Sequence, residues 1–103
     1  MNVLMIRSKF NTEHVADAQA AIEKVVQALE ESQLAGVRYA VTRLSDGVTL
    51  IALLEVENSE NPALDNPLRA LPAYADLLEN LKPWQAGPPT VEQMTVIGSY
   101  RLF

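Results

Sequence analysis

The feature that most restricts the fold is a pair of apolar stripes with helical spacing, which flank a strand–turn–strand segment. Members of the first stripe recur mostly every three or four residues, and the positions between them are mostly charged or polar, as in a helix with one buried face. The stripe consists of Val15, Ala18, Ile22, Val25, Val26 and Leu29. Asn11 and Thr12 can cap the start of this helix, and Gly36 is placed to end it.

The second stripe follows a polar loop at residues 57–67. It consists of Leu68, Leu71, Ala75, Leu78 and Leu81. Pro72 interrupts the stripe, but proline is tolerated in the first turn of a helix, because the missing N–H would have no helical partner there. We therefore expect one short turn and then a helix that begins at Pro72 and ends at Lys82-Pro83.

The remaining apolar segments have the alternation and the β-branched content of strands. The predicted strands are residues 2–10, 37–44, 48–56 and 90–102, with Gly98 as a bulge in the last. Ser45-Asp46-Gly47 is a tight-turn sequence, so the second and third strands are expected to form a hairpin.

The predicted element order is β-α-β-β-α-β, in one domain that covers residues 1–103. With right-handed crossovers, this order gives a four-stranded antiparallel sheet with both helices on one face. The expected fold class is therefore α+β, as a ferredoxin-like plait.

The face of the sheet without helices is predicted to be unusually apolar. In the third strand, Ile51 and Leu53 lie on the face opposite Leu50 and Leu54. The last strand also places apolar residues on both faces, with Met94, Val96, Tyr100 and Leu102 on one and Val91, Ile97 and Phe103 on the other. An extended apolar patch usually marks an interface. We expect a homodimer through the open sheet face, which would form a dimeric α+β barrel; a monomer with a modest apolar face is the alternative.

Composition excludes several classes of function. The absence of cysteine removes disulfides, thiolate metal sites and a cysteine nucleophile. Eight basic against 13 acidic residues give a net charge of −5, which argues against nucleic acid or an anionic membrane as partner. Four glycines form no phosphate-binding loop, and the single histidine and scattered carboxylates form no metal-binding pattern. No cofactor, metal, targeting segment or membrane span is expected, and the predicted location is the cytoplasm.

The chain resembles the antibiotic-biosynthesis-monooxygenase (ABM) superfamily of dimeric α+β barrels over its whole length. The residues that carry the resemblance are Gly36-Val37-Arg38-Tyr39 at the entry to the second strand, Arg43 and Asp46 before the hairpin turn, Glu55 at the end of the third strand, residues 77–83 in the second helix, and Pro88-Pro89 before the last strand. The resemblance implies monooxygenation without a metal, flavin or other prosthetic group, acting on phenols such as hydroquinones and anthrones. It also implies a pocket between the sheet and the helices.

A haem-degrading branch of the same superfamily uses a histidine on the second helix. Here the only histidine is His14, at the start of the first helix, so haem chemistry of that type is not expected. A tryptophan common in the third strand of relatives is also absent, because this chain has Val56-Glu57 there. The simpler interpretation of His14, a lone histidine in the first turn of a helix, is a solvated side chain without a catalytic role.

Five side chains are candidate site residues, each with a structural alternative. Arg43 and Tyr74 are predicted as catalytic, as a cation and a proton or hydrogen-bond donor. Tyr39, Arg69 and Trp84 are predicted to bind substrate. The alternatives are a surface or interface salt bridge for either arginine, a buried hydroxyl with one partner for either tyrosine, and packing of a helix end for the tryptophan.

The sequence is compatible with three functions. The first is a cofactor-independent monooxygenase of the ABM type. The second is a non-catalytic dimeric barrel that binds a small apolar or aromatic molecule, which the missing family histidine and tryptophan favour. The third is an isomerase or decarboxylase on the same barrel, because a fold does not fix a function.

Overall fold

The structure is a computed structural model, which describes residues 2–59, 61–62 and 66–101. The elements in chain order are β1 (Asn2–Lys9), the 3₁₀ turn η1 (Thr12–His14), α1 (Val15–Ser32), β2 (Val37–Arg43), β3 (Thr49–Val56), η2 (Pro67–Ala70), α2 (Pro72–Leu81), η3 (Lys82–Trp84) and β4 (Thr90–Thr95).

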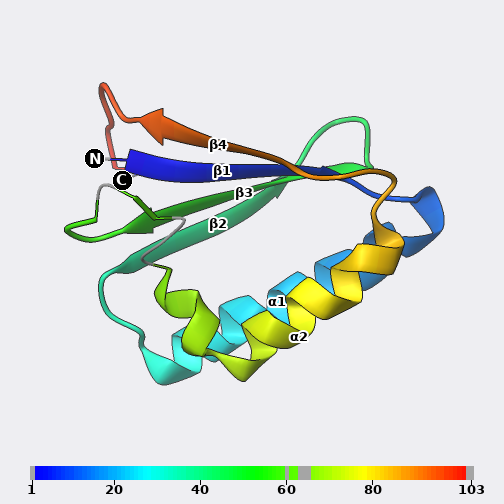
Figure 1. The fold of residues 1–103 in the computed structure, drawn as a ribbon, viewed down its shortest axis with the longest axis horizontal. Coiled ribbons are helices and arrows are strands. Elements are labelled where there is room, and N and C mark those ends of the chain that lie inside the picture. Colours follow the sequence, from blue (N-terminus) through cyan, green and yellow to red (C-terminus); the bar gives the residue numbers. More distant parts are fainter. Residues whose placement is uncertain (1, 60, 63–65, 102–103) are drawn as a thin grey trace.

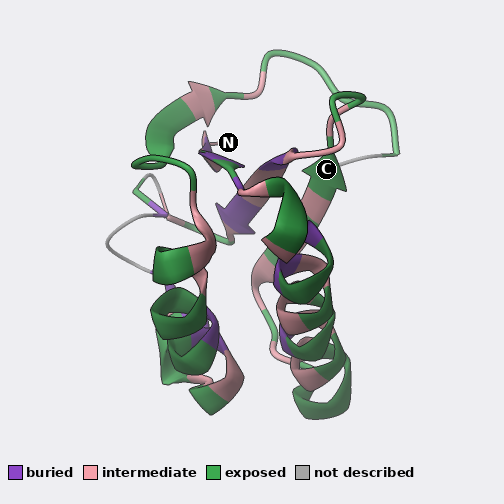
Figure 2. Cartoon of the chain, turned by 90° about the vertical axis from the view of Figure 1, so that its right-hand side faces the viewer, coloured by how far each residue is buried: buried purple, intermediate pink, exposed green. Residues whose placement is uncertain are grey.

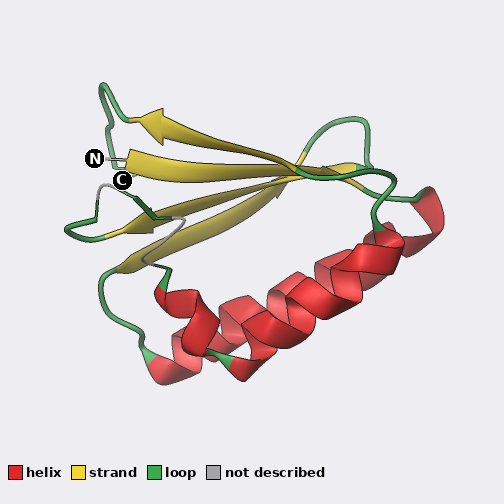
Figure 3. Cartoon of the chain, in the orientation of Figure 1, coloured by secondary structure: helices red, strands yellow, loops and turns green. Residues whose placement is uncertain are grey.

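The four strands form one sheet in the order β2-β3-β1-β4, and every neighbouring pair is antiparallel. Both helices lie on the same face of this sheet (Figure 1), which leaves the other face without a helical layer (Figure 3). The predicted α+β ferredoxin-like fold is confirmed.

The first helix ends earlier than the sequence predicted. Gln33 takes the left-handed conformation directly after Ser32, with φ of 49°. Gly36, the predicted stop, also has a positive φ, and its carbonyl oxygen accepts a 2.7 Å hydrogen bond from the Glu57 N–H. The glycine therefore shapes the entry into β2, and the helix itself is closed by Gln33.

The second helical region agrees with its prediction, because a short 3₁₀ turn precedes a helix that begins at Pro72. Asn66 caps this turn by accepting the Leu68 N–H on its side-chain oxygen. Leu71 is extended between the turn and the helix, so the chain changes direction there.

The last strand is shorter than predicted. It ends at Thr95, and the predicted alternation beyond it does not hold, because residues 96–101 are not part of the sheet. Ile97 is fully exposed and Tyr100 is 82% exposed. The predictions for Leu102 and Phe103 lie outside the described residues.

The core lies between the sheet and the helices and consists of two clusters of buried side chains. The ribbon in Figure 2 marks the buried residues in purple, on the strands and on both helices. The first cluster contains Leu4, Val25, Leu54, Leu68, Tyr74 and Leu77. The second contains Phe10, Val15, Ala18 and Leu50, with Trp84 packed against it.

The first predicted stripe supplies Val15, Ala18 and Val25 to this core from one face of α1. The second predicted stripe is wrong at its centre, because Ala75 and Leu78 are exposed and α2 buries Tyr74 and Leu77 instead. The buried face of α2 is therefore displaced by one residue, which is about 100° around the helix axis.

Candidate functional site

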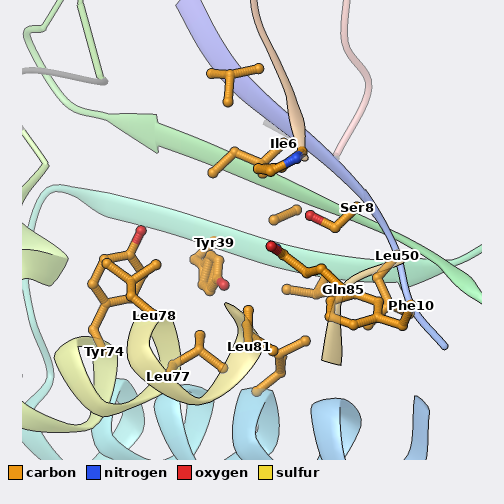
Figure 4. A pocket seen from close by; sticks show the side chains of 15 residues that line it. Ile6, Ser8, Phe10, Tyr39, Leu50, Tyr74, Leu77, Leu78, Leu81 and Gln85 are labelled. Atoms are coloured by element: carbon orange, nitrogen blue, oxygen red, sulfur yellow. The ribbon is translucent and has the colours of Figure 1, made fainter. Parts of the chain in front are cut away.

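A cavity of about 260 Å³ lies between α2 and the helix-covered face of the sheet. Its walls come from both core clusters, for example Leu77 from the first and Phe10 and Leu50 from the second (Figure 4). Most lining side chains are aliphatic or aromatic, and no acidic, lysine, arginine or histidine side chain is among the described ones. The cavity therefore suits a small apolar ring system rather than a charged ligand.

Two small residues at the centre of the sheet make room for this cavity. Ala52 pairs with Ile6 on one side and with Val41 on the other, and Ser8 pairs with Leu50. All five residues line the cavity, so they share one face of the sheet. The helices lie over this face at a distance set by its larger side chains, so alanine and serine leave unfilled volume.

Tyr74 brings a buried hydroxyl to one part of the cavity wall, and its only hydrogen-bond partner in the described part of the chain is Asn66. The amide orientation of Asn66 is fixed because its oxygen accepts the Leu68 N–H at 3.0 Å. Its nitrogen must then donate to the Tyr74 oxygen, at 3.3 Å. Since the Tyr74 oxygen accepts this bond, its own O–H remains available to donate to a molecule in the cavity.

Tyr39 is the second tyrosine in the cavity wall, placed by β2 opposite Leu54. Burial raises the pKa of the Tyr39 hydroxyl far above its ordinary value, and the neighbouring Tyr74 raises it further. The Tyr39 hydroxyl is therefore neutral near pH 7 and can donate a hydrogen bond. It is unsuited to act as a general base.

Ser8 and Gln85 are the other lining residues with polar side chains. Ser8 faces the cavity from β1, and Gln85 follows η3. Neither side chain has a hydrogen-bond partner within residues 2–59, 61–62 and 66–101. Sequence reasoning missed these two residues and Asn66, because only the tertiary structure shows which polar side chains face an internal cavity.

Arg43 does not line this cavity. Its guanidinium donates a 2.8 Å hydrogen bond to the Gln19 side chain on α1. It lines a neighbouring hollow of about 130 Å³, which shares Ile22, Val41 and Leu50 with the larger cavity. The predicted catalytic pair, Arg43 and Tyr74, is therefore not brought together in one wall.

Arg69 and Trp84 also lie outside the cavity lining. Arg69 is an exposed residue of η2. Trp84 packs against the second core cluster and stacks on His14, with ring centroids 5.9 Å apart and planes 17° apart. Of the five predicted site residues, the structure brings only Tyr39 and Tyr74 together at the cavity.

The described residues contain no group of three or more histidine or carboxylate side chains that could hold a metal ion. No helix among them has the length and apolarity needed to cross a membrane.

Comparison by sequence gives no relatives: no family model matches the chain, and no curated protein does. Comparison by structure gives many. The chain is similar to a crystal structure of an antibiotic biosynthesis monooxygenase, with a TM-score of 0.74, 15% identity, and coverage of 95% of this chain and 100% of the other.

The chain is also similar to a protein from Nitrosomonas europaea that is provisionally named an antibiotic biosynthesis monooxygenase. The TM-score is 0.74 and the sequence identity 16%, with coverage of 95% of this chain and 100% of the other. The structure of Rv0793 from Mycobacterium tuberculosis has a TM-score of 0.62 and 22% identity, with coverage of 95% and 96%. At these identities the likeness concerns the fold, and the resemblance to the ABM superfamily is confirmed at that level: the chain has the fold of solved structures named antibiotic biosynthesis monooxygenase.

Proposed function

We propose that this chain is a cofactor-independent monooxygenase of small aromatic phenols, hydroquinones or anthrone-type molecules. The observation that carries the proposal is the apolar cavity with the Tyr74 O–H left free to donate into it. The fold supports the proposal, because several solved structures that share it carry monooxygenase names.

In this proposal the substrate oxygen accepts a hydrogen bond from Tyr74, and Tyr39 is the second donor. Donors fixed in a water-poor site stabilise negative charge more strongly than water-exposed donors do. They would lower the pKa of a bound phenol or enol, so that more of the ligand is present as its anion. The hydrogen bond from Asn66 holds the Tyr74 oxygen in place while this happens.

The anion can then transfer one electron to molecular oxygen, which a neutral closed-shell molecule does only slowly. For an anthrone-type methylene group, the net change is R₂CH₂ + O₂ → R₂C=O + H₂O. The carbon is oxidised by four electrons, and one oxygen atom of O₂ enters the product while the other leaves as water. The apolar walls of the cavity would limit side reactions of the intermediates with water.

The test is oxygen uptake by the purified protein with a panel of hydroquinones and anthrones, and with no metal or flavin added. Tyr74→Phe should lower the turnover rate about 100-fold, the usual cost of removing one donor to a developing anion. Tyr100→Phe is the matched control, because Tyr100 is 82% exposed and lies away from this cavity. Uptake that is unaffected by Tyr74→Phe, or no uptake above the uncatalysed rate, would contradict the proposal.

The second candidate is a barrel that binds an aromatic molecule without transforming it. The observation that favours it is the absence of any side chain able to act as a base at neutral pH among the described lining residues. Calorimetric binding of the same panel without oxygen uptake, and with weaker binding by Tyr74→Phe, would support this alternative.

We also propose that the protein forms a homodimer through the open sheet face. Ile51 and Leu53 are only half-buried on that face. Glu55 lies on the same face with its side chain 10% exposed, and its Oε2 atom is buried without a hydrogen-bond partner in the described structure. A second copy could cover the apolar residues and supply the missing donor, whose absence costs about 1–3 kcal/mol for a buried polar group.

Light scattering tests the dimer: a mass near one chain at micromolar concentration would refute it. Leu53→Glu should convert a dimer to monomers, because it places a charge in the proposed interface. The cytoplasmic location stays a prediction, which fractionation of cells expressing the protein would check.

A further inference from the structure

Two polar residues of the cavity wall, Ser8 and Gln85, have no role in the proposed reaction at Tyr74. Ser8 is a buried residue, only 7% exposed, on the cavity side of β1. Its side chain makes no hydrogen bond within the part of the chain that the structure describes. The hydroxyl is therefore available to donate a hydrogen bond to a ligand in the cavity or to accept one from it.

Gln85 is held beside Ser8 by the backbone. Gln85 and Phe10 form an isolated antiparallel bridge, and the Ala86 N–H donates to the Lys9 carbonyl at 2.8 Å. In such a pairing, the residue two positions before Phe10 is the diagonal neighbour of Gln85, within reach of a long side chain. That residue is Ser8. Figure 4 shows the Gln85 side chain extending into the cavity on the side of Ser8 and Phe10.

The tyrosines lie farther along the sheet. Ser8 pairs with Leu50, whereas Tyr39 pairs with Leu54. Leu50 and Leu54 are four residues apart on β3, which corresponds to about 13 Å of strand. The wall between them is apolar, formed by Ala52 and Ile6 from the sheet and by Leu77 from α2. Figure 4 shows Tyr74 and Ser8 at opposite sides of the cavity.

We propose that Ser8 and Gln85 form a second subsite, which hydrogen-bonds an oxygen at the far end of an elongated fused-ring ligand. The first oxygen of that ligand lies at Tyr74, and its ring system lies against the apolar wall. The inference rests on the proposed function in one respect, namely that the cavity takes an aromatic phenol. It adds that the ligand carries oxygen at both ends, and it assigns that selectivity to Ser8 and Gln85.

The test compares naphthalenediols with naphthols that lack one hydroxyl. Calorimetry under nitrogen would measure the binding of 1,4-, 1,5- and 2,6-dihydroxynaphthalene, and of 1-naphthol and 2-naphthol as their one-oxygen counterparts. At least one diol should bind about 3- to 10-fold more tightly than its naphthol, the factor for one neutral hydrogen bond. Gln85→Leu and Ser8→Ala should each reduce this ratio, and the double variant should bring it near one, with naphthol binding unchanged.

Two controls separate the subsite from the rest of the cavity. Gln27→Leu is the same change on the exposed side of α1, so it should leave all affinities as they are. Tyr74→Phe should lower the affinities for a diol and for its naphthol by equal factors, since both compounds place a hydroxyl at Tyr74. Circular dichroism checks that Ser8→Ala and Gln85→Leu fold, and an apolar residue in an apolar wall is expected to be tolerated.

The failures are distinguishable. Equal affinities for every diol and its naphthol, or an equal loss for both in Gln85→Leu, would overturn the second subsite while leaving an aromatic-binding cavity. Binding of none of the five compounds would overturn the inference together with the aromatic function on which it rests.

Discussion

The two faces of the sheet are both apolar, yet they are used differently. On the helix-covered face, Leu50 and Leu54 are buried in two core clusters that adjoin a cavity. On the open face, Ile51 and Leu53 come from the same strand but remain half-buried. A continuous apolar run along a strand therefore indicates that both faces are to be covered, but it does not show what covers each face.

The polar groups differ in the same way. Tyr74 on the covered side has a defined partner in Asn66 and one hydrogen-bonding direction left over. Glu55 on the open side has one oxygen 3.8 Å from the exposed Arg38 and the other buried without a partner in the described structure. On the helix-covered face, a ligand in the cavity could accept the remaining hydrogen bond of Tyr74. On the open face, a second protein surface is needed to pair the buried oxygen of Glu55.

The largest expected effect is a loss of stability that differs between two neighbouring residues of β3, Leu54 on the helix-covered face and Leu53 on the open face. Leu54→Ala should lower the free energy of unfolding by about 2–5 kcal/mol, because Leu54 is 3% exposed and its loss leaves a hole in the core. Leu53→Ala is the matched change on the open face, and it should cost less in dilute solution. Urea denaturation measures both. Equal costs that do not depend on protein concentration would remove the distinction between the faces.

Filling the cavity should abolish ligand binding without unfolding the protein. Ala52→Leu places a larger side chain at the centre of the cavity wall, so affinity for naphthol should fall at least about 10-fold, with thermal stability retained or raised. Ala40→Leu is the matched control, because Ala40 lies on the open face of β2 and does not line the cavity. Unchanged naphthol binding by Ala52→Leu would show that the cavity is not the binding site.

Asn66→Ala should lower both the stability of the protein and its affinity for naphthol. It removes the cap of η2 and the donor to Tyr74, so the free energy of unfolding should fall by about 1 kcal/mol. Loss of the fixed hydroxyl direction should also weaken naphthol binding by a few-fold. Tyr74→Phe combined with Asn66→Ala should bind naphthol no worse than Tyr74→Phe alone. A further loss in the double variant would show that Asn66 acts on the ligand independently of Tyr74.

The smallest effect concerns the turn that fixes the register between β2 and β3. Asp46 accepts hydrogen bonds from the Thr49 hydroxyl and from the N–H groups of Val48 and Thr49, and these bonds lower the pKa of its carboxyl below the ordinary 3.8. A lowered folded pKa gives stability that is present above the unfolded pKa and is lost as pH falls through the folded value. A one-residue slip here would exchange the two faces of the sheet.

Asp46→Asn should therefore melt slightly below the original protein at pH 7, and the difference should shrink as the pH falls below about 4. Thermal melts across this pH range measure it. A difference that stays constant down to pH 2 would mean that the carboxylate charge does not contribute to the turn.

Much of the fold could be predicted from the sequence, because the signals are local. The stripe from Val15 to Leu29, the turn at Asp46 and the start of α2 at Pro72 depend on residues within a few positions of each other. Two errors lie at element ends: Gln33 closes α1 instead of Gly36, and β4 stops at Thr95. A third concerns the buried face of α2, where Tyr74 and Leu77 take the place of the predicted Ala75 and Leu78. A left-handed residue without a side-chain signal, or a strand that leaves the sheet, is decided by packing outside the local segment.

The candidate site could be predicted only in part. Tyr39 and Tyr74 were found because tyrosine in an apolar pattern is conspicuous, and both line the cavity. Nothing in the sequence marks the polar residues Ser8, Asn66 and Gln85 as part of a site. A tryptophan and a strand arginine, Trp84 and Arg43, are stronger candidates for a site by residue type. The structure places Trp84 on His14 and Arg43 on Gln19 instead.

The sequence by itself determined the order of strands and helices, the plait and the apolar character of both sheet faces, since these follow from periodicity and turn chemistry. Only the tertiary structure decided that Ala52 and Ser8 leave a cavity, that Asn66 donates a hydrogen bond to the oxygen of the cavity-lining Tyr74, and that Gln85 lies beside Ser8. The physical reason is that a cavity is the volume left between α2 and the sheet. That volume depends on side chains far apart in the chain, whereas a pattern along the sequence records only near neighbours.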